Sequence, residues 1–344
     1  MKIFFLVFCF MWLICTCIGC KDKITDPCSN GGNVLCYTKS YNGYGEIFTN
    51  NVMGTELQDI SNYPYGDDYS QWSPDGRYIV YSRSVSISGP LVIVYDKKNK
   101  TETNLTSDGG GASLTPQWAP NGKVYFAYQR PIGSTTATYL MNPDGSDKRK
   151  IWTLPSYFYQ DSYTFLYIDG TNKVYKTNID STINEFVLDL GTLNQYVAIQ
   201  GFNPNTEELL ISPKDTVGTY SIRTKSLAIL LTAEGGYTFF QLKYSKDYSK
   251  IALIEHSDKD EYLSILQNGV KKRLLQIPAS SPPVRFSYIP MQFSADGRYV
   301  AFSKQVYNSG QWISWRDDLY AVDINTDILY YIDEGRAPSW NPQP

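Results

Sequence analysis

The sequence predicts an all-β protein, a β-propeller of seven four-stranded blades whose ring is closed by strands from both ends of the chain. One stretch is written three times: QWSPDGRYIVYS at residues 71–82, QWAPNGKVYFAY at 117–128 and QFSADGRYVAFS at 292–303. Repeats of about 40 to 50 residues that each hold four short strands are typical of propeller blades. The repeat spacing and the two chain ends therefore predict the fold together.

Each copy of the repeat reads as a strand, a tight turn and a second strand. In the first copy the turn is Pro74-Asp75-Gly76, where proline fixes φ, aspartate bonds its own backbone and glycine accepts positive φ. The following RYIVYS is β-branched and aromatic without a helical period. Two more strands come next, LVIVYD and TETNLT after the first copy, and ATYLMN and KRKIW after the second.

Weaker copies fill the interval between the second and third. The aromatic marker of the repeat falls at Trp72, Trp118, Phe202, Tyr244, Phe293 and Trp340. The interval from Trp118 to Phe202 is twice the usual one, so we place a degenerate unit at Gln160–Leu190. Trp340 has no strands after it, whereas GGNVLCYTKS at residues 31–40 lacks a preceding strand. One blade is therefore expected to be split between the termini, which gives seven blades, or six if the degenerate unit is only an insertion.

The N-terminus reads as a targeting segment. A lysine and an apolar run at residues 3–18 form the two parts of a signal peptide. Gly19-Cys20, followed by charged residues, resembles a bacterial lipoprotein signal, which implies cleavage before Cys20 and lipid on its thiol. Cys17 departs from the usual pattern, and cleavage there or an uncleaved anchor is the alternative. The expected division is a signal peptide at 1–19, a lipidated tether at 20–30 and the propeller at 31–344, anchored by lipid in the bacterial cell envelope, at the outer membrane and facing the periplasm or the surface.

Of the six cysteines, Cys28 and Cys36 remain once the signal peptide and the lipidated thiol are set aside. In an oxidising compartment the two can form a disulfide. Cys36 lies in the strand-like NVLCYTKS, so a buried free thiol is equally compatible with the sequence. No histidine or second cysteine pair accompanies them, so no metal site is expected there.

The repeats SPDGRYIVYS, APNGKVYFAY and SADGRYVAFS, with turns such as NPDGSD, resemble the TolB-type propeller repeat. That repeat occurs in the periplasmic protein TolB and in the propellers of the prolyl oligopeptidase class. The resemblance covers the whole mature chain and implies the fold, but fold alone does not determine function. TolB also carries an α/β domain before its propeller and is not lipidated, so its partners are not carried over.

The sequence contains no recognisable catalytic motif. We therefore predict that the chain is not an enzyme, with no catalytic residue and no cofactor. There is no G-x-S-x-G elbow, and the only histidine, His256, lies in a charged turn-like stretch. The segment Asn142–Asp147 lacks the distal acid of a calcium loop, so no metal is expected. The net charge of -3 argues against a nucleic-acid partner. A metal-dependent hydrolase with carboxylates converging in the central channel is a third alternative.

Aromatic residues and arginines gather in the connections at one end of the predicted ring. Tyr, Trp and Arg are typical anchors of binding surfaces, although such rings also pack under their own loops. We therefore expect a monomer that binds an envelope protein with this end, or alternatively a glycan or peptide for nutrient capture. The candidate ligand-binding residues are Tyr63, Tyr65, Tyr159, Tyr237, Phe240, Arg285, Tyr288, Trp312, Trp315 and Arg316.

Overall fold

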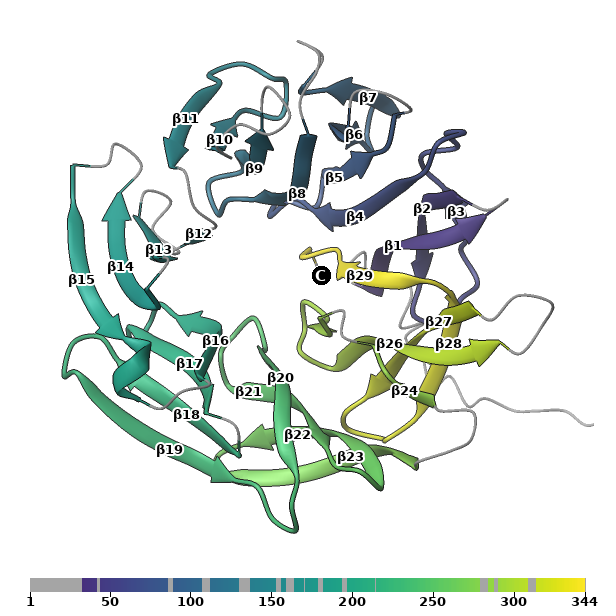
Figure 1. Ribbon diagram of the computed structural model, residues 1–344. Helices are drawn as coiled ribbons and strands as arrows, with labels where there is room; N and C mark the ends of the chain where they lie inside the picture. The colour runs from purple at the N-terminus through teal and green to yellow at the C-terminus, as the bar shows by residue number, and fades with distance from the viewer. Residues whose placement is uncertain are drawn as a thin grey trace, which may run out of the picture.

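The strands form seven sheets arranged as a ring around a central space (Figure 1). The structure is a computed structural model that describes residues 33–41, 44–85, 89–106, 112–129, 137–152, 156–158, 164–169, 171–178, 182–193, 197–213, 215–278, 284–287, 290–308 and 314–343. We number the blades along the chain and label the strands of each blade A to D from the centre outward. The protein is a seven-bladed β-propeller, as the repeats predict.

The first four blades have the following strands. Blade 1 has β29 (Arg336–Trp340), β1 (Val34–Tyr41), β2 (Tyr44–Asn51) and β3 (Gln58–Asp59). Blade 2 has β4 (Asp67–Trp72), β5 (Tyr78–Arg83), β6 (Leu91–Asp96) and β7 (Thr101–Asn104). Blade 3 has β8 (Ala112–Trp118), β9 (Val124–Gln129), β10 (Ala137–Met141) and β11 (Arg149–Trp152). Blade 4 has β12 (Ser156–Phe158), β13 (Thr164–Ile168), β14 (Lys173–Asn178) and β15 (Asn184–Asp189).

The remaining three blades complete the ring, after a short 3-10 helix at Leu190–Thr192. Blade 5 has β16 (Val197–Asn203), β17 (Glu208–Pro213), β18 (Thr216–Ser221) and β19 (Ser226–Thr232). Blade 6 has β20 (Thr238–Tyr244), β21 (Lys250–His256), β22 (Asp260–Gln267) and β23 (Val270–Pro278). In blade 7 the inner strand is broken into β24 (Val284–Phe286) and β25 (Gln292–Phe293), followed by β26 (Tyr299–Asn308), β27 (Ser314–Asp323) and β28 (Leu329–Glu334).

Two predictions about unusual blades are confirmed. In blade 1 the C-terminal strand β29 pairs antiparallel with β1, with Leu35 opposite Trp340, so strands from both ends of the chain close the ring. This pairing within one sheet fixes the two ends of the propeller to each other. The degenerate unit is a true blade, because β12–β15 form a sheet of their own, beginning a few residues before Gln160.

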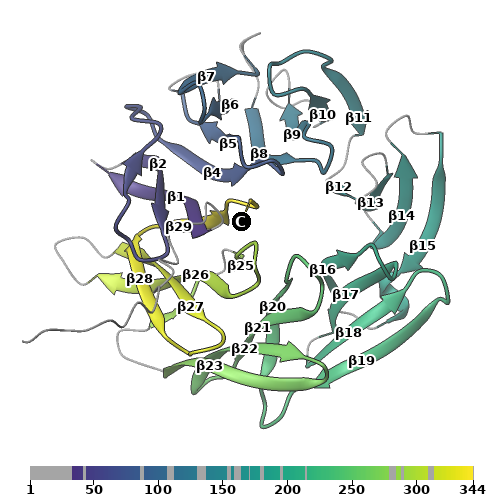
Figure 2. The ribbon, with the colours of Figure 1, turned by 180° about the vertical axis from the view of Figure 1, so that it is seen from behind.

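Every blade is antiparallel, so its A–B and C–D connections lie at one end of the ring and its B–C and D–A connections at the other. We call the first end the turn face, with A–B turns such as 73–77, 245–249 and 294–298. We call the second the loop face, with connections such as 60–66, 233–237 and 257–259. The C-terminus lies near the centre of the ring, beside β25 in the view from behind (Figure 2).

The A–B turns explain the most regular part of the repeat. In blade 7 the hydroxyl of Ser294 donates to Asp296 at 2.5 Å and accepts the backbone N–H of Tyr299 at 2.9 Å. The serines of blades 2 and 6 make the same pair of bonds. Gly297 has a φ of +66°, which a residue with a side chain adopts less easily. Glycine therefore suits this position of the turn, although Tyr248 adopts the same conformation in blade 6 with a φ of +60°.

The arginine that follows the turn has a structural role. In blade 7 the guanidinium of Arg298 lies 2.7 Å from Asp323, whose side chain is fully buried at the end of strand C. In blade 2 Arg77 and Asp96 make the same pair at 2.7 Å. These ion pairs join strands B and C at the turn face.

The aromatic marker joins neighbouring blades. The indole N–H of Trp118 donates to the carbonyl of Gln71 in the preceding blade at 3.0 Å. The indole N–H of Trp340 donates to Gln292 in blade 7 at the same distance. Both rings are buried, in clusters that combine residues of adjacent blades. The marker thus packs the ring together.

The inner strands of blades 1, 2 and 3 contain a β-bulge that the sequence does not predict. Tyr69, Thr115 and Ala337 have positive φ values of 59°, 36° and 54°. Each lies three residues before the tryptophan of its strand, where the pairing register shifts. Bulges increase the local bend of a strand. Because the same bulge recurs in blades 1, 2 and 3, it belongs to the scaffold rather than to one site.

Candidate functional site

Three tyrosines at the junction of blades 1 and 2, near the loop-face end of their strands, expose about half of their surface. Tyr44, Tyr65 and Tyr69 have relative exposures of 49%, 50% and 53%. The ring of Tyr63 lies beside that of Tyr65, with centroids 5.8 Å apart. We call Tyr44, Tyr63, Tyr65 and Tyr69 the tyrosine patch. Exposed tyrosines combine an apolar ring with a polar tip, which suits contact with another molecule.

The patch rests on a buried ion-pair network in blade 2. The guanidinium of Arg83 lies 3.0 Å from Asp67 and 2.7 Å from Glu102. Its carbon also lies 4.1 Å from the ring centroid of Tyr63, a cation–π contact. Although desolvation opposes it, the bonds to Glu102 and Asp67 raise the pKa of Arg83. The charged guanidinium of Arg83 therefore holds the Tyr63 ring in one position.

The connection that carries Tyr63 is also fixed at its start. Glu46, which is buried, accepts hydrogen bonds from the hydroxyl of Ser61 and from the backbone N–H of Tyr63, both at 3.0 Å. The hydroxyl of Ser61 in turn accepts the N–H of Ile47 at 2.9 Å. A loop with satisfied backbone groups loses little entropy when it binds.

Ion pairs connect blades 7, 1 and 2 beside the patch. Lys39 of β1 lies 2.8 Å from Asp333 of β28. Arg336 of β29 lies 2.5 Å from Asp68 of β4. These two pairs cross from one blade to the next, so they hold the three blades in fixed relative positions.

Blade 7 contributes further carboxylates to this region. Arg316 pairs with Asp318 at 2.8 Å and with Glu334 at 3.1 Å. Burial raises the pKa of Asp317, and one of its carboxylate oxygens is buried without a hydrogen-bond partner among the described residues. Among the residues that the structure describes, no three aspartate, glutamate, histidine or cysteine side chains are grouped as a metal site requires.

In blade 6 the predicted aromatic residues have partners within the protein. The hydroxyl of Tyr237 donates to Asp260 at 2.5 Å, and the guanidinium of Arg273 lies 5.1 Å from the Tyr237 ring. Phe240 packs edge-on against His256, with centroids 6.1 Å apart. Both rings are half-buried. They pack against blade 6 rather than joining the tyrosine patch.

Of the other candidate residues, two arginines bond within blade 7, and four aromatic residues lie partly or wholly outside the part of the chain that the structure describes. Arg285 is half-buried and donates to Gln305 at 3.3 Å, and Arg316 is held in the ion pairs described above. Trp315 lies in β27 opposite Tyr307, and the structure describes only its backbone. Tyr159, Tyr288 and Trp312 lie outside the described residues. Among the candidates whose side chains the structure describes, Tyr63 and Tyr65 lie in contact.

Cys36 is buried in β1 and is a free thiol in the structure. Burial raises its pKa to about 12, which makes the thiol unreactive. Cys28 and the lipidation candidate Cys20 lie outside the described residues, so the disulfide and the lipid anchor stay predictions. No helix in the described ranges is long and apolar enough to span a membrane.

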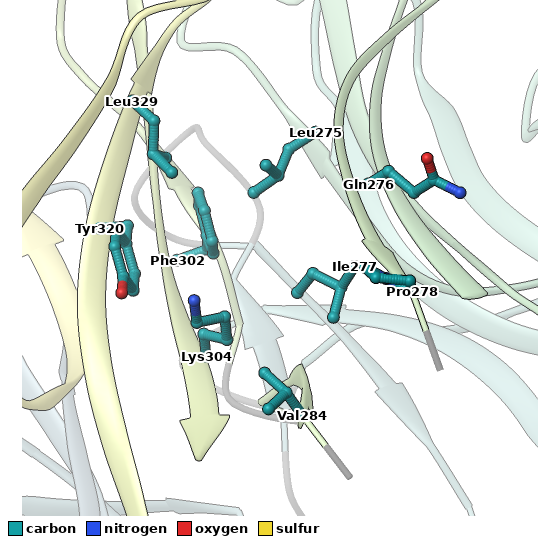
Figure 3. Close-up of a pocket in the computed structure, with 9 residues that line it drawn as sticks. All are labelled: Leu275, Gln276, Ile277, Pro278, Val284, Phe302, Lys304, Tyr320 and Leu329. Carbon is teal, nitrogen blue, oxygen red and sulfur yellow. The ribbon is translucent and has the colours of Figure 1, made fainter. Parts of the chain in front are cut away.

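A cavity of about 250 Å³ lies in the groove between blades 6 and 7. One wall belongs to β23 and the other to the strands of blade 7 (Figure 3). Its lining is mainly apolar, and the amine of Lys304 points into the space between the walls. The lining residues are Leu275, Gln276, Ile277, Pro278, Val284, Phe302, Lys304, Tyr320 and Leu329.

Sequence reasoning missed two of these features. Tyr44 follows an Asn-Gly pair, and such pairs mark hairpin tips, which could have placed it on the loop face. Phe302 and Lys304 are two residues apart on a strand and therefore face the same side. A lysine on the side of a strand where apolar residues are expected was thus a signal in the sequence for the cavity.

Comparison with known proteins identifies the fold. No protein-family profile matches the sequence, and no curated protein matches it either. TolB from Acinetobacter baumannii is similar in structure with a TM-score of 0.53 and 14% identity, over 90% of this chain and 83% of that one. The fold is a TolB-like β-propeller. The resemblance read from the three repeats is thereby confirmed.

Two enzymes share the TolB-like propeller. An oligogalacturonate lyase from Vibrio parahaemolyticus has a TM-score of 0.58 and 10% identity, over 88% of this chain and 85% of that one. A puromycin-hydrolysing peptidase from Mycobacterium tuberculosis has a TM-score of 0.57 and 10% identity, over 88% of this chain and 53% of that one. The prediction that the chain is not an enzyme is therefore wrong. The absence of a hydrolase motif does not exclude catalysis, because proteins with this fold include enzymes.

Proposed function

We propose that the protein is a lipid-anchored propeller of the bacterial cell envelope that binds a partner protein through the loop face. The observation that carries the proposal is the tyrosine patch, in which Tyr44, Tyr65 and Tyr69 are each half-exposed. Tyrosine supplies a large contact area and loses few rotamers on binding. It is also enriched among residues that dominate binding energy at interfaces.

The rigidity of the patch supports a protein partner. Arg83 fixes Tyr63 from below, and the ion pairs of Lys39 and Arg336 lock the neighbouring blades. A surface that is already ordered avoids much of the entropy lost on association. Stable protein interfaces need roughly 800 Å² on each partner, an area that a loop face spanning several blades supplies.

A capture experiment tests the partner. The mature propeller from Ser29 onward is used as bait in a detergent extract of the host envelope, with captured proteins quantified by mass spectrometry. The test variant is Tyr44→Ala with Tyr65→Ala. The matched control is Tyr331→Ala, because Tyr331 is also 50% exposed but lies on the outer strand β28.

The proposal expects a partner that the unchanged bait and the Tyr331→Ala bait retain and that the double variant loses at least tenfold. If all three baits capture the same proteins, the tyrosine patch is not the interface. If none captures a specific protein, glycans are the next ligands to test on the same variants, since tyrosine rings also stack on sugar faces.

The anchor has its own test. The segment ending in Gly19-Cys20 supports lipidation of Cys20, and one lipid-modified cysteine would hold the propeller at the membrane. Changing Cys20→Ser in the full chain is expected to leave the precursor uncleaved and to abolish incorporation of labelled palmitate. Unchanged labelling, or labelling that is lost only in Cys17→Ser, would overturn this assignment.

A further inference from the structure

The cavity between blades 6 and 7 combines mainly apolar walls with the amine of one half-buried lysine, Lys304. Leu275 and Ile277 of β23 face Val284 and Phe302 of blade 7 across a volume of about 250 Å³ (Figure 3). An apolar cavity of about 150 Å³ is large enough for a benzene ring. The space therefore suits an aliphatic chain of roughly eight carbons.

Lys304 supplies the only positive charge among the described residues that line this cavity. Its side chain is half-buried, and its amine lies 4.6 Å from the ring centroid of Tyr320. The carboxylate at the cross-strand position, Asp318, is paired with Arg316 at 2.8 Å. No ion pair of Lys304 is present in the part of the chain that the structure describes.

An ammonium group beside apolar walls favours an anion as its neighbour, because removal from water disfavours an unpaired charge. We propose that this cavity binds an aliphatic monocarboxylate of medium chain length, with its carboxylate on Lys304 and its chain between Ile277 and Phe302. The Tyr320 ring keeps the amine in place by the cation–π contact. This inference is independent of the proposed partner protein, whose proposed contact is the tyrosine patch at the junction of blades 1 and 2.

Charge and length determine which ligands fit. An amine of the same length would be repelled by Lys304, and an alcohol would leave the ammonium without a counter-charge. Each methylene buried between the walls is expected to strengthen binding by up to about fourfold. The gain should end when the chain is longer than the cavity.

The test is calorimetric titration of the mature protein with hexanoate, heptanoate, octanoate, decanoate and dodecanoate, each below the concentration at which it forms micelles. Octylamine and octan-1-ol serve as charge controls. The expected result is saturable binding that tightens two- to fourfold per methylene up to about octanoate or decanoate and then levels off, with no binding of octylamine.

The matched variants are Lys304→Met, which keeps an unbranched apolar side chain, and Lys259→Met, which removes an exposed lysine in the turn 257–259. Lys304→Met is expected to weaken octanoate binding at least tenfold while octan-1-ol binds as well or better. Lys259→Met is expected to leave both affinities within twofold. Thermal unfolding of each variant checks that it is folded.

A third variant tests the cavity itself. Leu329 is 39% exposed at the edge of the cavity, so Leu329→Trp fills space at little risk to the fold and is expected to abolish octanoate binding. The proposal is overturned if octanoate does not bind the unchanged protein saturably, if affinity is independent of chain length, or if Lys304→Met binds octanoate unchanged. None of these results depends on capture of a protein partner by the tyrosine patch.

Discussion

The turn face and the loop face of this propeller are built from the same strands but differ in regularity. On the turn face, Ser73, Ser245 and Ser294 make the same two hydrogen bonds in three different blades. On the loop face, the connection carrying Tyr63 is fixed by Glu46, whereas the one carrying Tyr237 is fixed by Asp260. The repeat therefore encodes the scaffold at one end and leaves the other end free to vary.

The largest expected effect comes from breaking ring closure. Trp340→Ala removes a buried ring that packs on Tyr299 at 6.2 Å and donates to Gln292. Truncating a buried aromatic residue costs about 3–5 kcal/mol, so the free energy of unfolding by urea should fall by that amount. Tyr331→Ala is the control, with a loss expected below about 1 kcal/mol, because that ring is half-exposed and makes only an edge-on contact with Tyr320. A loss below about 1 kcal/mol for Trp340→Ala would contradict the closure.

A smaller loss is expected at the turn-face ion pairs. Asp323→Asn leaves Arg298 without its charged partner, which should lower the free energy of unfolding by about 2 kcal/mol, since Asp323 is buried and Arg298 half-exposed. Asp96→Asn, which breaks the corresponding pair in blade 2, should behave alike. Clearly unequal losses would show that the two blades are not equivalent.

The loss of stability in Asp323→Asn should depend on pH. Burial alone would raise the pKa of Asp323, but the hydrogen bonds from Arg298 and Asn325 outweigh it and hold the pKa below its ordinary value. The stabilisation is therefore complete above the unfolded pKa, about 4, and is lost as the pH falls through the lower folded value. The difference between the unchanged protein and Asp323→Asn should shrink below about pH 4, measured by urea unfolding from pH 7 to 2. A constant difference would contradict this assignment.

The turns themselves sharpen the comparison. Ser73→Ala, Ser245→Ala and Ser294→Ala each remove one acceptor for a backbone N–H, worth about 1 kcal/mol. We expect three losses that agree within about 0.5 kcal/mol in thermal or urea unfolding. Losses that differ from one another by more than about 1 kcal/mol would show that the turn face is less regular than its hydrogen bonds indicate.

The smallest effect on stability is expected on the loop face. Tyr65→Ala changes a half-exposed side chain, and such substitutions usually alter the free energy of unfolding by less than about 0.5 kcal/mol. The comparison of the faces thus predicts stable variants there that lose binding. A loss of stability above about 2 kcal/mol would place Tyr65 in the scaffold instead.

The parts of the fold that repeat in sequence could be predicted, and the parts made by backbone geometry could not. Trp340 and the strand after Gly31 indicated the split blade because each lacked its neighbour in the chain. The bulge at Tyr69, Thr115 and Ala337 gave no signal, because three unlike side chains adopt the same backbone conformation.

The site was predicted only in outline, for a related reason. Aromatic residues in the loop-face connections were expected to form one cluster, but Tyr237 donates to Asp260 within its own blade. Tyr63 joins Tyr65 because Arg83, twenty residues away, lies under its ring. Such partners are chosen by blade-to-blade packing, which a single stretch of sequence does not reveal.

The most direct test of the division between the two faces is site-specific photocrosslinking in the living host. A photoreactive phenylalanine is placed at Tyr65 on the loop face and, in a second strain, at Asn205, an exposed position in the A–B turn of blade 5. The account predicts a discrete crosslinked species from position 65 and none from position 205. Crosslinks from position 205 alone, or equally from both, would contradict the claim that the loop face is the binding surface.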